Sequence, residues 1–170
     1  MPREKPRTPA KSPPVRRQAL LSTADSPYYQ LWVLSNLTAK PFPRFGAQFH
    51  LNLTEWRIML TVADRPGISA QELADHSGLD KMSVSRAVRG LEAQGRLARE
   101  GSETDRRMRH LSLTDAGWLV YTQIARAARA REAQVYSELS PAELDSLREM
   151  LKKLSRQARL GAGDDGDQKP

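Results

Sequence analysis

Two short helices that follow each other almost without a break constrain the fold of this chain most. Ser69 and Glu72 stand three residues apart, in the spacing of a capping box, and begin the first helix. The segment 76–78 ends that helix, and Asp80 is an N-cap for a second helix that runs to Gln94. This spacing predicts a helix-turn-helix whose second helix has the size that fits a DNA major groove.

The two faces of this second helix differ in chemistry. Val84, Val88 and Leu91 are spaced four and three residues apart and mark the buried side. The outward side holds hydrogen-bond donors and no carboxylate before Glu92. An ordinary solvated helix face has a similar composition, so both interpretations stay open for this helix alone. The candidate DNA-binding residues are Lys81, Ser83, Ser85, Arg86 and Arg89.

After this helix the pattern changes to the two-residue period of strands. Leu97 begins an extended stretch, residues 101–105 form a polar turn, and Arg109, Leu111 and Leu113 alternate with more polar side chains. We therefore expect a β-hairpin that follows the two helices. Together these elements predict a winged helix-turn-helix in a mainly α fold with a small β-hairpin wing.

The tip of the hairpin is rich in arginine. Asp105 stands two residues before Arg107, where a carboxylate can orient the guanidinium group through a bidentate pair. An oriented arginine suits a narrow minor groove, in which the negative potential is concentrated. A charged strand edge that prevents aggregation is the alternative. The candidate wing residues are Asp105, Arg106 and Arg107.

Helical patterns flank the winged segment on both sides. Ser26 and Pro27 open a first helix that should end near Lys40, because prolines follow at positions 41 and 43. Asn52 and Glu55 form a capping box for another helix, with Trp56, Met59, Leu60 and Ala63 on its apolar face. A long helix starts at Thr114, and a last helix starts at Ser140. The last helix carries an apolar row that we expect to pack against a partner: Leu144, Leu147, Leu151 and Leu154.

Four motifs give the chain a family resemblance over about residues 28–158. They are Leu-Thr-Glu-Trp-Arg at 53–57, the helix pair 69–94, Asp-Arg-Arg at 105–107 and Leu-Thr-Asp-Ala-Gly at 113–117. With these motifs the chain resembles the MarR family of bacterial transcription regulators. The aspartate-x-arginine wing followed by the Leu-Thr-x-x-Gly motif is the most specific part of the match.

The resemblance implies a homodimer whose first and last helices interlock. It also implies winged lobes that bind a pseudo-palindromic double-stranded operator, with the helix 80–94 as recognition helix and Asp105 and Arg107 as the wing pair. A small-molecule pocket would lie between the dimerisation helices and each winged lobe, and Glu132 is at a position where similar proteins contribute a pocket residue. Pro41 and Pro43 depart from the family pattern, and the lack of cysteine excludes its oxidation-sensing branch.

The organisation expected from these patterns has three parts. Residues 1–24 form a disordered, basic, proline-rich arm with six basic side chains and one acidic side chain. Residues 25–160 form the MarR-like domain, with dimerisation helices at about 26–49 and 114–160 and the winged helix-turn-helix at about 52–113. Residues 161–170 form a disordered acidic tail.

Charge and composition narrow the class of partner. The formal net charge is +7, and a basic arm on a basic body favours nucleic acid, although a solubilising tail has the same composition. The chain has no cysteine, which excludes disulfides and thiolate chemistry. No stretch approaches the ~18 apolar residues that a membrane span needs. We therefore expect a cytoplasmic protein, associated with the nucleoid when bound to DNA, without a membrane partner.

A group of aromatic residues surrounds the expected bend after the first helix, and cationic residues are close in sequence. An aromatic wall with a cationic anchor suits a small aromatic carboxylate. Aromatic side chains that simply fill the core at the join of two lobes are the equal alternative. The candidate ligand-binding residues are Phe42, Phe45, Phe49, His50, Trp56 and Arg57.

The expected function is therefore DNA-binding transcription regulation. The resemblance implies a repressor that a small aromatic or heteroaromatic carboxylate from a catabolic pathway releases from its operator. A ligand-independent repressor or an architectural DNA-binding protein is the alternative. An enzyme is not expected, because the three histidines are far apart and no H-E-x-x-H, G-x-S-x-G or phosphate-binding glycine loop is present. No cofactor or metal is expected either.

Overall fold

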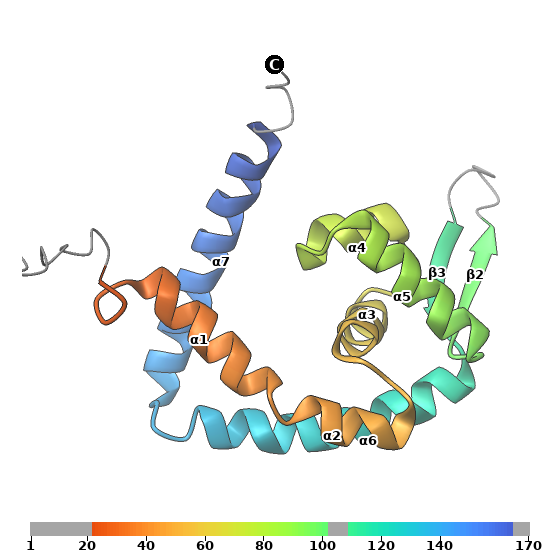
Figure 1. The fold of residues 1–170 in the computed structure, drawn as a ribbon, viewed down its shortest axis with the longest axis horizontal. Helices are drawn as coiled ribbons and strands as arrows, with labels where there is room; N and C mark the ends of the chain where they lie inside the picture. The colour runs from red at the N-terminus through yellow and green to blue at the C-terminus, as the bar shows by residue number, and fades with distance from the viewer. Residues whose placement is uncertain (1–21, 102–108, 165–170) are drawn as a thin grey trace, which may run out of the picture. The chain divides into compact units, whose positions relative to one another are not determined.

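The computed structural model describes residues 22–101 and 109–164, and the chain divides into two units, one ending at Phe45 and the other beginning at Gly46. Helix α1 (Pro27–Ala39) belongs to the first unit, and the short helix α2 (Phe42–Gly46) ends at the division. The second unit contains the following elements, coloured in chain order in Figure 1: η1 (Ala47–Phe49), α3 (Leu53–Asp64), β1 (Ile68–Ser69), α4 (Ala70–Ser77), α5 (Lys81–Ala93), β2 (Leu97–Gly101), β3 (Arg109–Leu113), α6 (Asp115–Val135) and α7 (Pro141–Asp164).

Helix α3 is the centre of the second unit. Helices α4, α5 and α6 and strand β3 all pack against it, and Figure 1 shows α4 and α5 on one side of it. The most deeply buried side chains come from each of these elements: Ile58, Met59, Val62, Leu73, Val84, Val88, Leu91, Leu111 and Ile124. The expected mainly α fold with a small wing is confirmed.

The buried face of α3 differs from the predicted one. Trp56 and Met59 are buried as expected and Ala63 is half-buried, but Leu60 is 44% exposed. Ile58 and Val62 are buried in its place, because α4, α5 and α6 surround α3 and bury a wider arc than a single row of apolar residues.

The wing contains three strands instead of the two predicted. The antiparallel order is β1-β3-β2, with Ile68 opposite Leu111 and Leu97 opposite Leu113. Strand β1 has only two residues, too few to show an alternating pattern in the sequence. Its pairing with β3 joins the start of α4 to the wing, so the helix-turn-helix and the sheet form one body.

The predicted helix starts are all present. The side chains of Ser26, Asn52, Ser69, Asp80 and Thr114 each accept a hydrogen bond from the backbone N–H three residues later. Helix α1 ends at Ala39, as the prolines predict. Helix α7 continues to Asp164, so it includes the first four residues of the expected acidic tail, 161–164. Among the residues that the structure describes, no helix is long and apolar enough to cross a membrane.

The join between the wing and α6 explains the Leu-Thr-x-x-Gly motif. The hydroxyl of Thr114 donates to the carbonyl oxygen of Gly95 at 2.7 Å and accepts from the N–H of Gly117 at 3.0 Å. The N–H of Thr114 donates to the carbonyl oxygen of Arg96 at 3.1 Å. A Cβ atom on Gly117 would collide with that same carbonyl, so only glycine allows α6 to start this close to the end of α5.

Replacing Gly117 with alanine should therefore lower the free energy of unfolding by about 1–3 kcal/mol, the usual cost of forcing an extra carbon into a packed site. Gly161→Ala is the matched control, because a Cβ atom on Gly161 in α7 meets nothing within 4 Å. That control should leave stability unchanged or raise it by up to ~1 kcal/mol through helix propensity. Urea unfolding followed by circular dichroism gives both values. Equal effects of the two substitutions would contradict this account of the motif.

Candidate nucleic-acid interface

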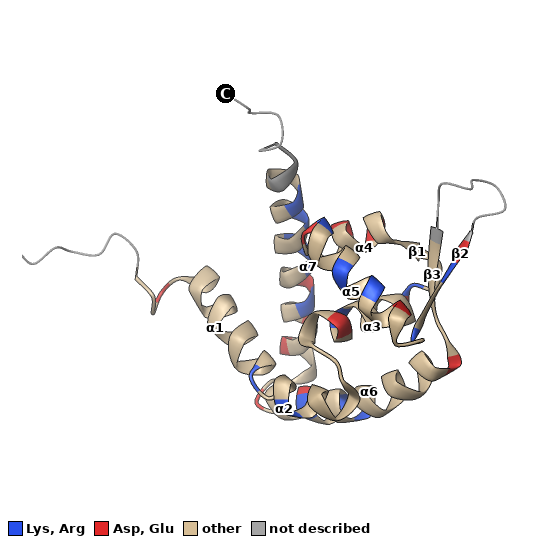
Figure 2. Cartoon of the chain, turned by 45° about the vertical axis from the view of Figure 1, so that its right-hand side comes forward, with Lys and Arg blue, Asp and Glu red and all other residues tan. Residues whose placement is uncertain are grey.

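Helix α5 presents a basic face opposite its buried face. Val84, Ala87, Val88 and Leu91 are buried against the core. The charged residues predicted for the outward side, Lys81, Arg86 and Arg89, are exposed, whereas Ser83 and Ser85 are half-buried at its edges. Figure 2 shows the basic residues as blue bands along α5. The structure thus brings the five predicted residues to one side of one helix.

A buried carboxylate holds α5 close to the start of α3. Glu55 is 8% exposed, and its Oε2 accepts the N–H of Asn52 at 2.9 Å in the predicted capping box. Its Oε1 lies directly beneath Gly90 of α5, 2.7 Å from where a Cβ atom on that glycine would stand. Glycine at position 90 therefore allows the cap of α3 and the backbone of α5 to meet.

The first turn of α5 is fixed by Asp80. Its Oδ1 accepts the backbone N–H of Ser83 at 2.8 Å. Hydrogen bonding by the side chain and then by the backbone of Ser83 lowers the pKa of Asp80 below its usual value, and the charge of Arg86 adds to this. The ionised carboxylate thus stabilises the turn that presents Lys81.

The other end of α5 is tied to the sheet. Glu92 Oε1 lies 2.8 Å from Nε of Arg99 on β2, and both side chains are largely shielded from solvent. On β3, Nδ1 of His110 lies 2.6 Å from the carbonyl oxygen of Gly67, just before β1. The base of the wing is therefore joined to α5 through Arg99 and Glu92. The wing residues Asp105, Arg106 and Arg107 lie outside the described residues.

The helix-turn-helix also contacts the last helix of the chain. The guanidinium group of Arg159 on α7 donates to the carbonyl oxygens of Asp75 at 3.3 Å and His76 at 2.9 Å, at the C-terminal end of α4. Burial lowers the pKa of His76, and the positive charges of Arg65 and Arg159 lower it further. A cation at this end of a helix is favourable for the helix dipole, so Arg159 links α7 to α4.

The residues of the predicted ligand site fall in both units. Phe42 and Phe45 belong to the first unit and are half-buried. Phe49 in the second unit is also half-buried, while His50 and Arg57 are exposed.

Trp56, the remaining member of the predicted site, is part of an aromatic cluster between α3 and α6. It is 7% exposed and stacks on Tyr121, with the ring centroids 5.8 Å apart and the planes inclined by 28°. Tyr121 in turn meets Trp118 edge-on at 5.3 Å. The sequence placed Tyr121 and Trp118 on α6 but gave no sign that they contact Trp56.

Arg96, which the sequence did not indicate as a candidate, makes a long-range contact with Phe49. Nη2 of Arg96 donates to the carbonyl oxygen of Phe49 at 2.6 Å. Nη1 of Arg96 is buried and has no hydrogen-bond partner among the residues that the structure describes. The two residues are 47 positions apart, so no local sequence pattern could indicate this contact.

Comparisons with known proteins agree with this geometry. A family model described as the MarR family matches residues 51–108. A MarR/EmrR family transcriptional regulator from Acinetobacter sp. ADP1, known from its crystal structure, is 32% identical with a TM-score of 0.73; the match covers 81% of this chain and 98% of that one. The chain belongs to the MarR family. It is thus a DNA-binding transcription regulator with a winged helix-turn-helix fold and not an enzyme.

Two relatives that are similar in sequence are also named as transcription regulators. A protein named as a transcriptional regulator for the hcr operon of Thauera aromatica is 33% identical over 100 residues, which is 59% of this chain and 60% of that protein. The HTH-type transcriptional repressor Rv2887 of Mycobacterium tuberculosis is 29% identical over 104 residues, which is 61% of this chain and 75% of that protein. The match thus spans about three fifths of the length of the first relative.

The cap at the start of α5 predicts a pH dependence of the stability of this MarR-family protein. Because the folded-state pKa of Asp80 is lowered, its carboxylate stabilises the folded protein above the ordinary value of 3.8. This contribution disappears as the pH falls through the lower folded-state pKa. Wild type should therefore unfold at higher urea concentration than Asp80→Asn at pH 7, and the difference between the two midpoints should shrink as the pH falls through the lowered folded-state pKa.

Glu138→Gln is the control for this measurement. It removes one carboxylate in the turn between α6 and α7, at a position that begins no helix. The same convergence in Glu138→Gln, or a constant difference for Asp80→Asn across the whole pH range, would contradict the role assigned to the cap.

Proposed function

We propose that this protein is a repressor that binds a pseudo-palindromic operator as a homodimer, with α5 of each subunit in a major groove. The observation that carries the proposal is the outward face of α5, where Lys81, Arg86 and Arg89 are exposed and no carboxylate stands before Glu92. The opposite face of α5 is buried in the core, so the basic face must point toward solvent. In a homodimer, two such helices about 34 Å apart read successive major grooves.

The wing supplies the second contact in this proposal. Arg106 and Arg107 are proposed to enter the flanking minor groove, with Asp105 orienting the guanidinium group of Arg107. The ion pair between Arg99 and Glu92 and the bond between His110 and Gly67 support this role, because they fix the base of the wing relative to α5.

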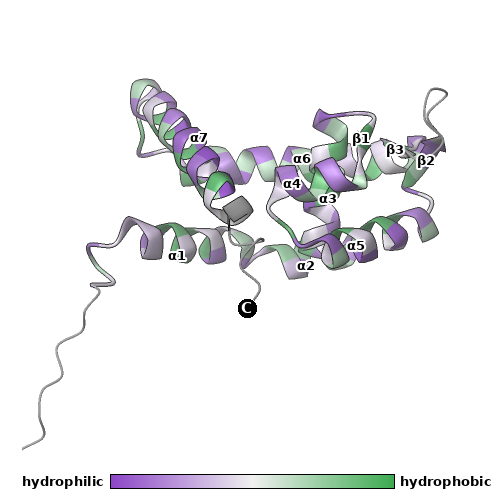
Figure 3. Cartoon of the chain, turned by 90° about the horizontal axis from the view of Figure 1, so that it is seen from above, coloured by the Kyte–Doolittle hydropathy of each residue, from purple (hydrophilic) through white to green (hydrophobic). Residues whose placement is uncertain are grey.

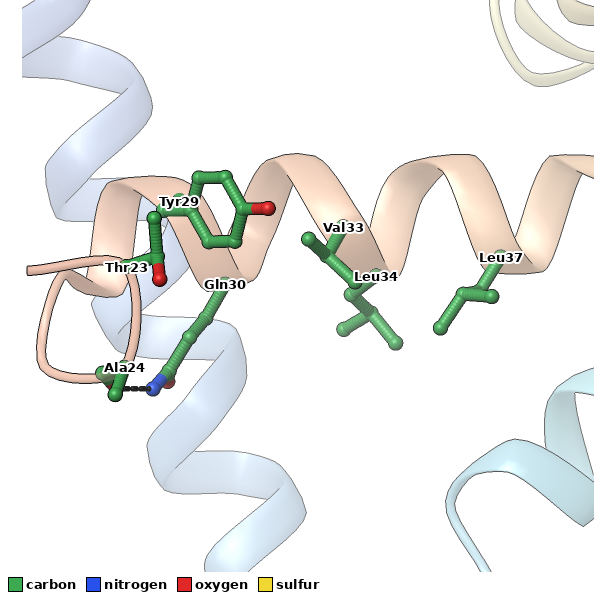
Figure 4. Close-up of a pocket in the computed structure, with 7 residues that line it drawn as sticks. All are labelled: Thr23, Ala24, Tyr29, Gln30, Val33, Leu34 and Leu37. Carbon is green, nitrogen blue, oxygen red and sulfur yellow. Dashed lines mark hydrogen bonds between the residues drawn. The ribbon is translucent and has the colours of Figure 1, made fainter.

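Exposed apolar surface on both units supports the homodimer. On α1, Trp32 and Leu37 are more than half exposed, and this helix lines a groove of about 400 Å³ (Figure 4). A second groove of similar volume on α7 is lined mainly by Leu139, Ala142, Leu147 and Met150. Figure 3 shows hydrophobic residues along both helices. We propose that residues 26–49 and 114–160 form the dimer interface, and that residues 52–113 form the DNA-binding lobe.

Replacing Arg86 with alanine tests the placement of α5. The substitution should weaken binding to an operator, selected from the DNA upstream of its own gene, by about 1–3 kcal/mol, or roughly 5- to 150-fold, if this side chain reaches base edges. Gel-shift titration at one fixed salt concentration gives the affinities.

The matched control for Arg86→Ala is Lys153→Ala. It removes one positive charge from the exposed side of α7 opposite Leu144. Operator affinity should stay within a factor of about two of wild type, because Lys153 lies outside the proposed DNA-binding lobe and neutralises no phosphate there. An equal loss in both variants would mean that only net charge matters, and it would contradict the proposal for α5.

We further propose that a small aromatic or heteroaromatic carboxylate from a catabolic pathway lowers the affinity for DNA. In the second unit, Phe49, Trp56 and Tyr121 supply aromatic surface, and Arg96 supplies a cation whose buried Nη1 has no hydrogen-bond partner in the part of the chain that the structure describes. His50 and Arg57 are the anchors suggested by sequence, but both are exposed to solvent, where attraction to an anion is weak. Arg96 is therefore the preferred anchor. A ligand-independent repressor, in which these aromatic residues only pack, is the competing function.

The ligand would act by a population shift. An acid that binds better to a dimer with the wrong spacing of the two α5 helices favours that state, and about 1–3 kcal/mol of coupling lowers DNA affinity 5- to 150-fold. Arg96 suits such coupling because its carbonyl oxygen binds Thr114 at the start of α6 and its side chain binds Phe49.

A panel of aromatic acids and their amides, titrated into the protein–operator complex, tests the sensor. An acid should release the operator and quench tryptophan fluorescence, while its amide should act far more weakly. Arg96→Gln should abolish this difference but keep the DNA affinity measured without ligand, whereas Arg57→Ala and His50→Ala should respond like wild type. Failure of every acid to change DNA binding would leave the ligand-independent repressor.

A further inference from the structure

Met82 is exposed on the recognition helix without a structural reason. It stands in the first turn of α5 and is 64% exposed, although the other large apolar side chains of this helix, Val84, Val88 and Leu91, are buried. The core contacts of α5 come from Val84, Val88 and Leu91, so Met82 takes no part in folding this helix onto α3. A single exposed apolar side chain is ordinary on a protein surface, so the exposure of Met82 gains its meaning from where the residue lies on the helix.

Helix geometry places Met82 at the centre of the outward face. With about 100° between successive residues, Arg86 lies roughly 40° from Met82 around the helix axis and Arg89 roughly 20° from it. Lys81 and Ser83 lie about 100° to either side. Ser83 is half-buried and accordingly stands at the edge of the exposed surface. Met82 and the two arginines therefore point toward whatever α5 contacts.

The chemistry of this stripe fits the major groove. The first residues of a recognition helix approach the base edges, and arginine binds the acceptors of guanine there. The apolar group that a base pair presents in the major groove is the 5-methyl group of thymine. Methionine is unbranched and flexible, so it can follow such a methyl group without a fixed side-chain conformation.

We infer that Met82 contacts the 5-methyl group of a thymine in each half-site of the operator. Through this contact, Met82 would be a residue that determines sequence specificity. The inference rests on the proposed placement of α5 in the major groove. In this arrangement Arg86 and Arg89 contact the neighbouring guanines and phosphates. The inference predicts that the operator carries a thymine close to the position that Arg86 reads.

Uracil substitution of the operator tests this contact, because uracil differs from thymine only by the missing methyl group. Each thymine of a selected operator is replaced in turn, and gel-shift titration at fixed salt gives the affinities. Wild type should bind about fourfold more weakly for one thymine in each half-site, the factor expected when one methyl group loses its burial. Met82→Ala should bind the thymine and uracil forms of that operator equally.

Leu60→Ala is the matched control, since Leu60 on α3 is also an exposed apolar residue, at 44%, and it lies outside both α5 and the proposed dimer interface. It should discriminate thymine from uracil as wild type does. Met82→Leu should keep part of the discrimination, because it retains an apolar side chain of similar volume.

Two results would overturn the inference. One is a wild-type protein that binds every uracil-substituted operator as tightly as the original, and the other is undiminished discrimination in Met82→Ala. A wild-type protein that selects no sequence at all would instead refute the proposed function, and this inference would fall with it. If the wild-type protein binds its operator normally but does not respond to uracil, the inference about Met82 fails while the proposed function stands.

Discussion

The packing of α5 against α3 is the interaction on which the rest of the structure depends. The carboxylate of Glu55 lies directly beneath Gly90 of α5 while it caps α3. Val88 and Leu91 complete the contact with fully buried side chains. One face of α5 is therefore committed to the core, and Lys81, Arg86 and Arg89 can only point outward. The specificity of a DNA-binding lobe begins with this fixed orientation.

The described arginines include two kinds. Arg96, Arg99 and Arg159 make hydrogen bonds or ion pairs that join separate segments: η1 to the residues between α5 and β2, α5 to the wing, and α4 to α7. Arg86 on α5 is exposed, and its charge is proposed to serve the DNA contact. The basic composition therefore serves both the internal architecture and the DNA-binding surface, and net charge alone cannot separate the two roles.

Local rules predicted the helices of this chain, and long-range packing decided what those rules missed. Capping residues such as Ser69 and Asp80 act within three positions, so the sequence displays them directly. Strand β1 exists because Ile68 pairs with Leu111, and the exposure of Leu60 is set by how many elements surround α3. The same holds for the site: the outward side of α5 followed from its apolar row, but the contact of Arg96 with Phe49 did not. The exposure of Met82 depends on how α5 sits against α3, so it appears only in the structure.

Methylation protection of the operator tests the central claim, that α5 reads the major groove through one fixed face. Dimethyl sulfate modifies N7 of guanine in the major groove and N3 of adenine in the minor groove, so one experiment separates the two. The account predicts protected guanine N7 atoms in two patches about 10 base pairs apart, each lost in Arg86→Ala. Protection confined to adenine N3, or guanine protection that Arg86→Ala leaves intact, would contradict it.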